Sequence, residues 1–476
     1  MLAVLLLGAF MPTLDFFIVN VAVPSIGTDL TATGGETQLV VAAYAIVYAC
    51  FLVLGGWIGD YWGPKKAFIV GIALFTATSA VCGFAPDVWW LIIGRALQGG
   101  ASVVLFPQVL ALIQIHYPPA ERPRVMRVYG LALGSAMAMG QFLGGALITL
   151  NWLGLTWRWA FLINLPIGVL ALLLAPRLLP ATDRLGSRRI DRTGVALCAV
   201  AMVLLVLPLT VGRSVGWPGW ALAMLAGAAV VLPCFWLWER RVESRGLDAI
   251  LPPSLLHVGA LRIGLLTVFA FYASLSSFLY VLSLLLQEGR ALSPLQSGLI
   301  STPLAVGFCV ASMGSHSLTA RWGMRPLKVA MCVQIVGYAA QFLLLLAEPR
   351  DVNMAALGTL LAVNGACTGA VMGPLLGLIL EGMRPEQAGT ASGLLATTQQ
   401  VAGAVGLSVI GIVFYGVSRH ASLDAAHITT GYRHGLVFLT LTSGATLAGL
   451  FLLARARERR AAAQASAAAA IPAVGR

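Results

Sequence analysis

The chain has 476 residues, of which 59% are hydrophobic and only 10% are charged. Because soluble domains carry roughly 25% charged residues, this composition excludes a soluble globular protein and indicates an integral membrane protein. The net charge of +12 alone would suit a nucleic-acid partner, but the basic residues lie between long apolar segments, which favours a membrane setting.

Fourteen apolar stretches follow one another along the chain, each close to the ~20 residues that a helix needs to cross a bilayer. They cover residues 3–25, 39–59, 66–85, 88–112, 127–150, 157–176, 193–212, 218–238, 261–286, 296–315, 326–347, 352–380, 390–416 and 433–454. Only internally hydrogen-bonded helices or closed barrels can span lipid, and barrels show short alternating segments instead. The predicted fold is an all-α integral membrane protein with 14 transmembrane helices.

Lysine and arginine are concentrated on one side of these spans. If both termini are cytoplasmic, most of the 30 basic residues lie in cytoplasmic segments. This is the positive-inside bias of membrane proteins, and it explains the net charge without a nucleic-acid partner. It predicts a multi-pass protein of the plasma (inner) membrane with both termini in the cytoplasm.

Two longer loops, 177–192 and 239–260, bracket the seventh and eighth spans and leave six spans on either side. A Trp-Gly pair follows both the second and the tenth span, at 62–63 and 322–323, which indicates two related halves. We therefore predict the following divisions. They are an N-terminal six-helix bundle (1–176), a linker with two extra transmembrane helices (177–256), a C-terminal six-helix bundle (257–454) and a disordered cytoplasmic tail (455–476).

No pattern in the chain indicates an enzyme. The seven cysteines fall within apolar segments and lack metal-ligand spacing, and there is no phosphate-binding loop or metalloprotease motif. We expect no metal, no cofactor and no catalytic residues. Any work that the protein performs would then draw on an ion or solute gradient.

Two charged residues lie well inside predicted spans, Asp15 and Arg95. A charge at the bilayer centre costs roughly 2.5–3.5 kcal/mol on insertion scales, and burial disfavours an ionised carboxylate. Asp15 could therefore bind and release a proton, and protonation would free Arg95 from a pair between them. The alternative is a static ion pair that only orients helices.

Three further groups of residues are candidates for a transport pathway. The expected substrate cavity lies between the two bundles near the midplane, with Tyr44, Gln98, Gln141, Gln287, Gln399 and Gln400 as lining residues. A helix seam in the span 127–150 comprises Gly134, Gly140, Gln141, Gly144 and Gly145, small residues that allow close helix approach. Such a seam would rock during transport or, alternatively, only pack tightly.

The third group is a cytoplasmic gating loop after the second span, comprising Gly56, Gly59, Asp60, Gly63, Lys65 and Lys66. In the functional interpretation, Asp60 bonds a helix N-terminus or a basic partner in one state only. The alternative is a basic loop with turn glycines and no gating role.

These motifs resemble the fourteen-span drug:proton antiporter branch of the major facilitator superfamily over nearly the whole chain. The similar segments are LDFFIVNVAVP (14–24), GWIGDYWGPKKAF (56–68), LIIGRALQGGAS (91–102), WRWAFLINLPIG (157–168) and LLLQEGRALSPLQSGLISTP (284–303). The resemblance implies proton coupling at Asp15, proton transfer assisted by Arg95, and a monomer. Two positions depart from the pattern: Tyr61 and Pro64 replace basic residues of the loop, and Gln141 replaces a proline of the fifth-span motif.

The predicted function is proton-driven export of small amphipathic or toxic compounds by alternating access. The partners would be a small-molecule substrate, protons and the lipid bilayer. A dedicated metabolite exporter or a proton-coupled uptake symporter of the same fold is the alternative. A membrane sensor or scaffold would need an appended soluble domain, for which no segment is long enough.

Overall fold

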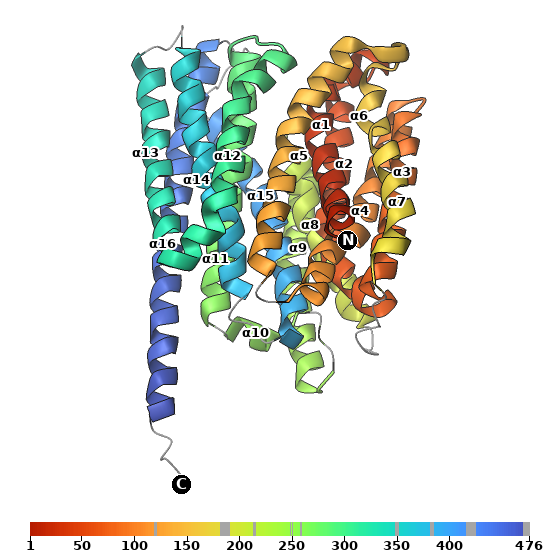
Figure 1. Cartoon of the computed structure of the whole chain (residues 1–476). Helices are drawn as coiled ribbons and strands as arrows, with labels where there is room; N and C mark the ends of the chain where they lie inside the picture. The colour runs from red at the N-terminus through yellow and green to blue at the C-terminus, as the bar shows by residue number, and fades with distance from the viewer. Residues whose placement is uncertain are drawn as a thin grey trace.

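The computed structural model describes residues 1–118, 121–180, 191–212, 216–247, 249, 251–257, 259–347, 352–380, 385–415 and 425–469. Within these ranges the regular secondary structure is entirely helical (Figure 1). Thirteen segments are long and apolar enough to cross a membrane. The remaining predicted span corresponds to α2, a helix of 29 residues, so the predicted set of fourteen spans agrees with the structure.

The N-terminal half forms seven α-helices, two of which share one span. These are α1 (Leu2–Asp29), α2 (Gly34–Trp62), α3 (Pro64–Gly83), α4 (Val88–His116), α5 (Arg122–Leu150), α6 (Trp159–Leu162) and α7 (Asn164–Leu178). Two short 3-10 turns, Trp152–Gly154 and Thr156–Arg158, precede α6. Ile163, the one residue between α6 and α7, keeps helical angles (φ −60°, ψ −26°) and its N–H bonds the Trp159 carbonyl, so the two helices form one continuous span, Thr156–Leu178.

The C-terminal half follows two extra helices, α8 (Arg192–Val211) and α9 (Gly219–Ser244), and the short α10 (Pro253–His257). Its six long helices are α11 (Gly259–Leu284), α12 (Pro294–Trp322), α13 (Arg325–Ala347), α14 (Met354–Leu380), α15 (Pro385–Tyr415) and α16 (Ala425–Ala469). A single π-turn, Leu285–Gly289, extends α11.

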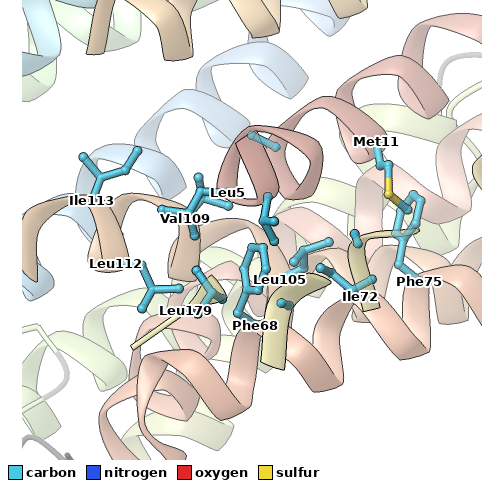
Figure 2. Close-up of a cluster of buried hydrophobic side chains, with 14 of the residues drawn as sticks. Leu5, Met11, Phe68, Ile72, Phe75, Leu105, Val109, Leu112, Ile113 and Leu179 are labelled. Atoms are coloured by element: carbon cyan, nitrogen blue, oxygen red, sulfur yellow. The ribbon is translucent and has the colours of Figure 1, made fainter. Parts of the chain in front are cut away.

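The two halves repeat the same packing scheme. In the N-terminal bundle α1 packs on α5, α2 on α4, and α3 on both α4 and α7. In the C-terminal bundle α11 packs on α15, α12 on α14, and α13 on both α14 and α16. Figure 1 shows these as two groups of helices side by side. Buried apolar side chains fill each group; Figure 2 shows one cluster that joins α1, α3, α4 and the end of α7 through Leu5, Phe68, Leu105 and Leu179.

The second helix of each half has the same local signals. Both α2 and α12 have 29 residues and begin with a capping box, in which a side-chain hydroxyl and a side chain three residues later bond each other's backbone N–H. The boxes pair Thr33 with Glu36 and Ser293 with Gln296. Each helix ends at a glycine with positive φ, Gly63 at 84° and Gly323 at 61°, a conformation that favours glycine. The repeated Trp-Gly pair is therefore a repeated helix end.

The predicted cytoplasmic loop over 56–68 is mostly helical in the structure. α2 continues to Trp62 and α3 begins at Pro64, so Gly63 alone makes the turn. Proline at the first position of a helix is favourable because its missing N–H would have no helical partner there. The sequence-based loop was therefore too long at both ends.

The predicted disordered tail also differs from the structure over residues 455–469, because α16 continues to Ala469. Alanine, arginine and glutamate are strong helix formers, and this stretch consists largely of them. The remaining tail residues, 470–476, lie outside the described part of the chain.

The extra helices contact both bundles. α8 packs on α2 of the first bundle and on α15 of the second, and α9 packs on α8. The Ser408 hydroxyl on α15 donates a hydrogen bond to the Leu209 carbonyl on α8, at 2.5 Å. On the opposite flank α5 packs directly on α12. The two bundles thus meet directly on both flanks, through α5 and α12 on one and through α2 and α15 on the other, where α8 also lies against both helices.

The contact between α2 and α4 predicts contrasting effects for two neighbouring glycines. A Cβ atom at Gly99 would lie 2.5 Å from the Tyr44 carbonyl oxygen, whereas one at Gly100 has only Val47 within reach, at 3.9 Å. We expect Gly99→Ala to force the helices apart and to lower the free energy of unfolding by about 1–3 kcal/mol, the usual cost of an overpacked contact. Gly100→Ala, the matched control, should leave the thermal midpoint of the purified protein unchanged. Equal midpoints for the two variants would contradict the close contact.

Candidate functional site

The two charged residues predicted within the membrane form an ion pair in the structure. Asp15 on α1 and Arg95 on α4 are both fully buried, and Arg95 Nη1 lies 2.5 Å from Asp15 Oδ2. Two side-chain ion pairs occur among the described residues, and this is the buried one; the other joins Arg158 and Asp29 in a more exposed setting. The sequence prediction that these two charges could meet therefore agrees with the geometry.

Two amide side chains complete the environment of the Asp15 carboxylate. Gln98 Nε2 on α4 and Asn164 Nδ2 at the start of α7 each donate a hydrogen bond to Asp15 Oδ1, both at 2.9 Å. Gln98 Nε2 also donates to the Ser79 hydroxyl on α3, at 2.8 Å. The carboxylate thus connects helices α1, α3, α4 and α7 inside one bundle.

The Arg95 guanidinium has its own set of buried partners. Its Nη1 donates to Gln98 Oε1 at 2.7 Å, and its Nε donates to the Val40 carbonyl on α2 at 3.1 Å. The ring of Tyr44 lies under the guanidinium, with 4.5 Å from Cζ to the ring centroid. Breaking a buried ion pair by removing one partner costs about 3–5 kcal/mol. Any protonation of Asp15 must therefore be accompanied by a rearrangement around Arg95.

Two buried polar atoms at this site have no hydrogen-bond partner within the described residues, Arg95 Nη2 and Asn164 Oδ1. Asn164 therefore presents an unused acceptor close to the carboxylate. A protonated Asp15 would need an acceptor for its O–H group, and rotation of the Asn164 amide would supply one, because its oxygen and nitrogen exchange places.

Asn164 was quoted within the sixth-span motif but not singled out as a site residue. Asn164 is an amide in an otherwise apolar run, and an amide within a membrane span needs a hydrogen-bond partner. This pattern could have marked Asn164 as a site residue. The partner could not be identified from the sequence because the face that α7 turns toward α1 depends on how the two helices pack.

Tyr44 and Gln98, which were predicted to line the substrate cavity, belong to the environment of the ion pair. Tyr44 is 3% exposed and Gln98 is fully buried. The Tyr44 hydroxyl bonds the Ser102 hydroxyl at 2.8 Å, and Ser102 in turn donates to the Gln98 carbonyl at 3.1 Å. The face of α4 that carries Arg95, Gln98 and Ser102 is thus buried against α2 and the carboxylate.

Aromatic rings continue outward from Tyr44. Tyr44 stacks on Tyr48, one turn along α2, with 6.0 Å between centroids and a 19° interplanar angle. Phe16, next to Asp15 on α1, has its ring 6.2 Å from Tyr44 and is 36% exposed. Tyr48 also meets the Phe106 ring on α4 at 6.2 Å. The buried guanidinium is thus connected by ring contacts to an exposed aromatic surface on α1.

The remaining predicted cavity residues do not contact the ion pair within the described part of the chain. Gln287 is half-buried in the π-turn after α11, where its Nε2 donates to Ser283 in the same helix at 3.1 Å. Gln399 and Gln400 are half-buried on α15. The side chain of Gln141 lies outside the described part of the structure.

The predicted seam on α5 divides between two neighbours. A Cβ atom at Gly134 would lie 2.7 Å from the Phe308 ring on α12, so this glycine sits at the contact between the bundles. Gly140 and Gly144 instead face α1, where added Cβ atoms would lie 2.8 Å from Phe17 and 3.1 Å from Ile18. Gly145 is buried on the same helix. The α1 segment that follows Asp15 therefore packs directly on α5.

The predicted gating residues lie at one end of the N-terminal bundle. Lys65 Nζ donates to the carbonyls of Leu179 and Pro176, at 2.5 and 3.1 Å, and so caps the end of α7. Gly59 lies against Gln108 of α4, whose Nε2 donates to the Gly55 carbonyl at 2.7 Å.

The other residues of this group provide fewer contacts. An added Cβ atom at Gly56 would meet nothing, and Lys66 is exposed. The side chain of Asp60 lies outside the described part. These contacts of Lys65 and Gly59 lie within the N-terminal bundle.

The exposed ion pair joins the end of α1 to the start of the sixth span. Asp29 Oδ2 accepts hydrogen bonds from Trp157 Nε1 at 2.9 Å and from Arg158 Nη1 at 2.6 Å. These hydrogen bonds hold the pKa of the Asp29 carboxyl below its usual value. The two acids of α1 thus differ sharply, since Asp15 is fully buried and Asp29 is 44% exposed.

A family model of the Major Facilitator Superfamily matches residues 5–407. The chain belongs to the major facilitator superfamily. Solved structures agree with this fold: the human organic anion transporter MFSD10 superposes with a TM-score of 0.63 at 18% identity, covering 95% of this chain and 98% of that one. A transporter fold is thus established, and no catalytic site is needed to explain the buried ion pair.

Curated relatives within this superfamily are transport and resistance proteins. The probable actinorhodin transporter of Streptomyces coelicolor is 34% identical over 417 residues, covering 87% of this chain and 72% of that protein. The puromycin resistance protein pur8 of Streptomyces alboniger is 33% identical, covering 91% and 86%. The tetracenomycin C resistance and export protein of Streptomyces glaucescens is 28% identical, covering 85% and 74%.

The environment of Asp15 predicts that Asn164 tunes its protonation. Asn164→Leu removes one of the hydrogen bonds to the carboxylate, which disfavours the ionised form. We expect the pH at which transport is half-maximal to move upward, by up to about one unit if the lost bond is worth ~1.4 kcal/mol. Transport measured in vesicles over a pH series checks this. Thr78→Val, a comparable change on α3, should leave the profile in place, and an unchanged profile for Asn164→Leu would contradict the assignment.

Proposed function

We propose that this protein exports small amphipathic compounds in exchange for protons, with Asp15 as the residue that carries the proton. The observation that supports this most directly is the fully buried carboxylate paired with a fully buried arginine at the junction of four helices. Charged side chains within membrane spans are costly and commonly mark proton or ion pathways. The relatives named for antibiotic transport and resistance support the export of such compounds.

The mechanism follows from the contacts of the pair. In the ionised state Asp15 ties α1 to α4 and α7 through Arg95, Gln98 and Asn164. A proton arriving from outside neutralises the carboxylate and weakens this tie. α1 can then shift along its seam with Gly140 and Gly144 of α5. Release of the proton to the cytoplasm restores the ion pair and the original packing.

Tyr44 links the protonation of Asp15 to the substrate. Its ring contacts both the Arg95 guanidinium and the rings of Tyr48 and Phe16. A planar or cationic compound stacked on the exposed ring of Phe16 would therefore sense whether Arg95 is paired. Aromatic faces bind flat apolar groups and cations without precise shape requirements, which suits a broad range of amphipathic substrates.

The proposed setting is the plasma membrane, with both termini cytoplasmic and the chain acting as a monomer. The distribution of basic residues supports this orientation. Both six-helix bundles and the linking helices belong to one chain, so a complete pathway between two bundles requires no second copy.

Replacement of the proton carrier tests the proposal. Asp15→Asn keeps the shape of the side chain and one acceptor oxygen, replaces the other oxygen with an NH2 donor, and cannot titrate. In vesicles with an imposed pH gradient, we expect loss of proton-driven substrate movement with substrate binding retained. Asp29→Asn, the matched control at the exposed pair, should transport normally, because exposed pairs contribute only about 0–1 kcal/mol.

The unpaired arginine left by Asp15→Asn would itself destabilise the protein, so a double variant, Asp15→Asn with Arg95→Gln, separates folding from function. We expect it to recover thermal stability without recovering proton-driven transport. Wild-type transport in a well-folded Asp15→Asn protein would exclude Asp15 as the carrier. Substrate accumulation in the same direction as the proton flux would instead contradict export.

The link through Tyr44 makes a separate prediction. A desolvated cation–π contact is worth about 2 kcal/mol, which corresponds to more than tenfold in an equilibrium. Tyr44→Leu should therefore lower the number of substrate molecules exported per proton by on the order of tenfold, with protons still entering. Tyr44→Phe keeps the ring and should stay close to wild type. Simultaneous measurement of substrate and proton flux checks this, and tight coupling in Tyr44→Leu would refute the link.

A further inference from the structure

The C-terminal bundle contains a buried polar face that the proposed transport mechanism does not use. Gln334, Tyr338 and Gln341 lie on one side of α13, at helical positions i, i+4 and i+7, with exposures of 4%, 1% and 0%. Gln334 Nε2 donates to the Tyr338 hydroxyl at 2.9 Å. The Tyr432 hydroxyl on α16 donates to Gln341 Oε1 at 2.8 Å.

Asn364 on α14 faces the middle of this polar side. A Cβ atom at Gly337, which lies between Gln334 and Gln341 on α13, would be 2.5 Å from Asn364 Oδ1. Asn364 is 1% exposed. Within the described residues, neither Nδ2 nor Oδ1 of Asn364 has a hydrogen-bond partner, and the same holds for Gln334 Oε1 and Gln341 Nε2.

The unpaired atoms define the chemistry of a ligand. They include two amide nitrogens, which donate, and two amide oxygens, which accept. Asn364 alone presents both an unpaired donor and an unpaired acceptor, so a cation would leave its nitrogen unsatisfied and an anion would leave its oxygen unsatisfied. The group that fits is small, neutral and able both to donate and to accept, as water is. Buried polar groups in folded proteins are almost always satisfied by protein or by ordered water.

The position of Asn364 matches that of Gln98 in the other bundle. Gln98 precedes Gly99, where an added Cβ atom would collide with the Tyr44 carbonyl on α2, and Asn364 precedes Gly365, where it would collide with the Leu304 carbonyl on α12. The residue three positions before Gln98 is Arg95, whereas the one three positions before Asn364 is the buried Leu361. The second bundle thus keeps the central amide without the arginine.

We propose that Asn364, Gln334 and Gln341 bind ordered water inside the C-terminal bundle, at the place equivalent to the Asp15–Arg95 pair of the N-terminal bundle. Bound water satisfies the amide groups that have no protein partner. It also gives the second bundle an uncharged polar centre between α13 and α14, independent of the proton carrier.

A high-resolution cryo-EM map of the full-length protein tests the site directly. We expect density within about 3.2 Å of Asn364 Nδ2 or Oδ1 in the wild type. Asn364→Val should remove this density and lower the thermal midpoint by on the order of 2 °C, because hydrogen bonds to the water are lost. Asn364→Ser keeps a group that donates and accepts, and should retain the density with a smaller change in midpoint.

Thr359→Val, on the exposed side of the same helix, is the control and should leave the midpoint unchanged. A dry site makes the opposite prediction for Asn364→Val: removal of an unpaired buried amide raises the midpoint. A raised midpoint, or a wild-type map without density beside Asn364, would overturn the proposal. The wild-type map decides the question even if a variant fails to fold.

Discussion

The buried contact between Asp15 and Arg95 is the constraint on which the N-terminal bundle depends. Two opposite charges in a low-dielectric interior attract strongly, but each has lost its hydration, so neither can be left without compensation. The surrounding groups reflect this requirement: two amides bond the carboxylate, and a carbonyl, an amide oxygen and an aromatic face surround the guanidinium. Four helices are thereby tied to the ionisation state of one carboxyl group.

The two bundles share a packing scheme but differ in charge at their centres. The shared part follows from local chemistry, since capping boxes and positive-φ glycines begin and end α2 and α12 in the same way. Glycines at equivalent helix contacts then bring α4 onto α2 and α14 onto α12. This shared helix packing fixes where the central side chains lie but not which residues they are. One bundle can therefore hold an ion pair and the other a neutral amide.

Much of the fold could be predicted from the sequence because lipid imposes simple rules. Long apolar runs identified the spans, and the scarcity of charge within them singled out Asp15 and Arg95. The rotation of each helix about its axis was harder to predict. Tyr44 and Gln98 were expected in the cavity lining, yet both turn toward the ion pair. Asn164 was missed because the packing of α7 against α1 sets its orientation. The helix over the tail up to Ala469 agrees with the helix propensity of its residues. The low-complexity composition of this stretch had suggested disorder instead.

The position of α8 restricts how the two halves can move relative to each other. This helix lies against α2 and α15 at once and is bonded to α15 through Ser408, while α2 and α15 also pack on each other. On the opposite flank α5 packs against α12. A swinging motion of the bundles must therefore carry α8 along or shear it past one neighbour.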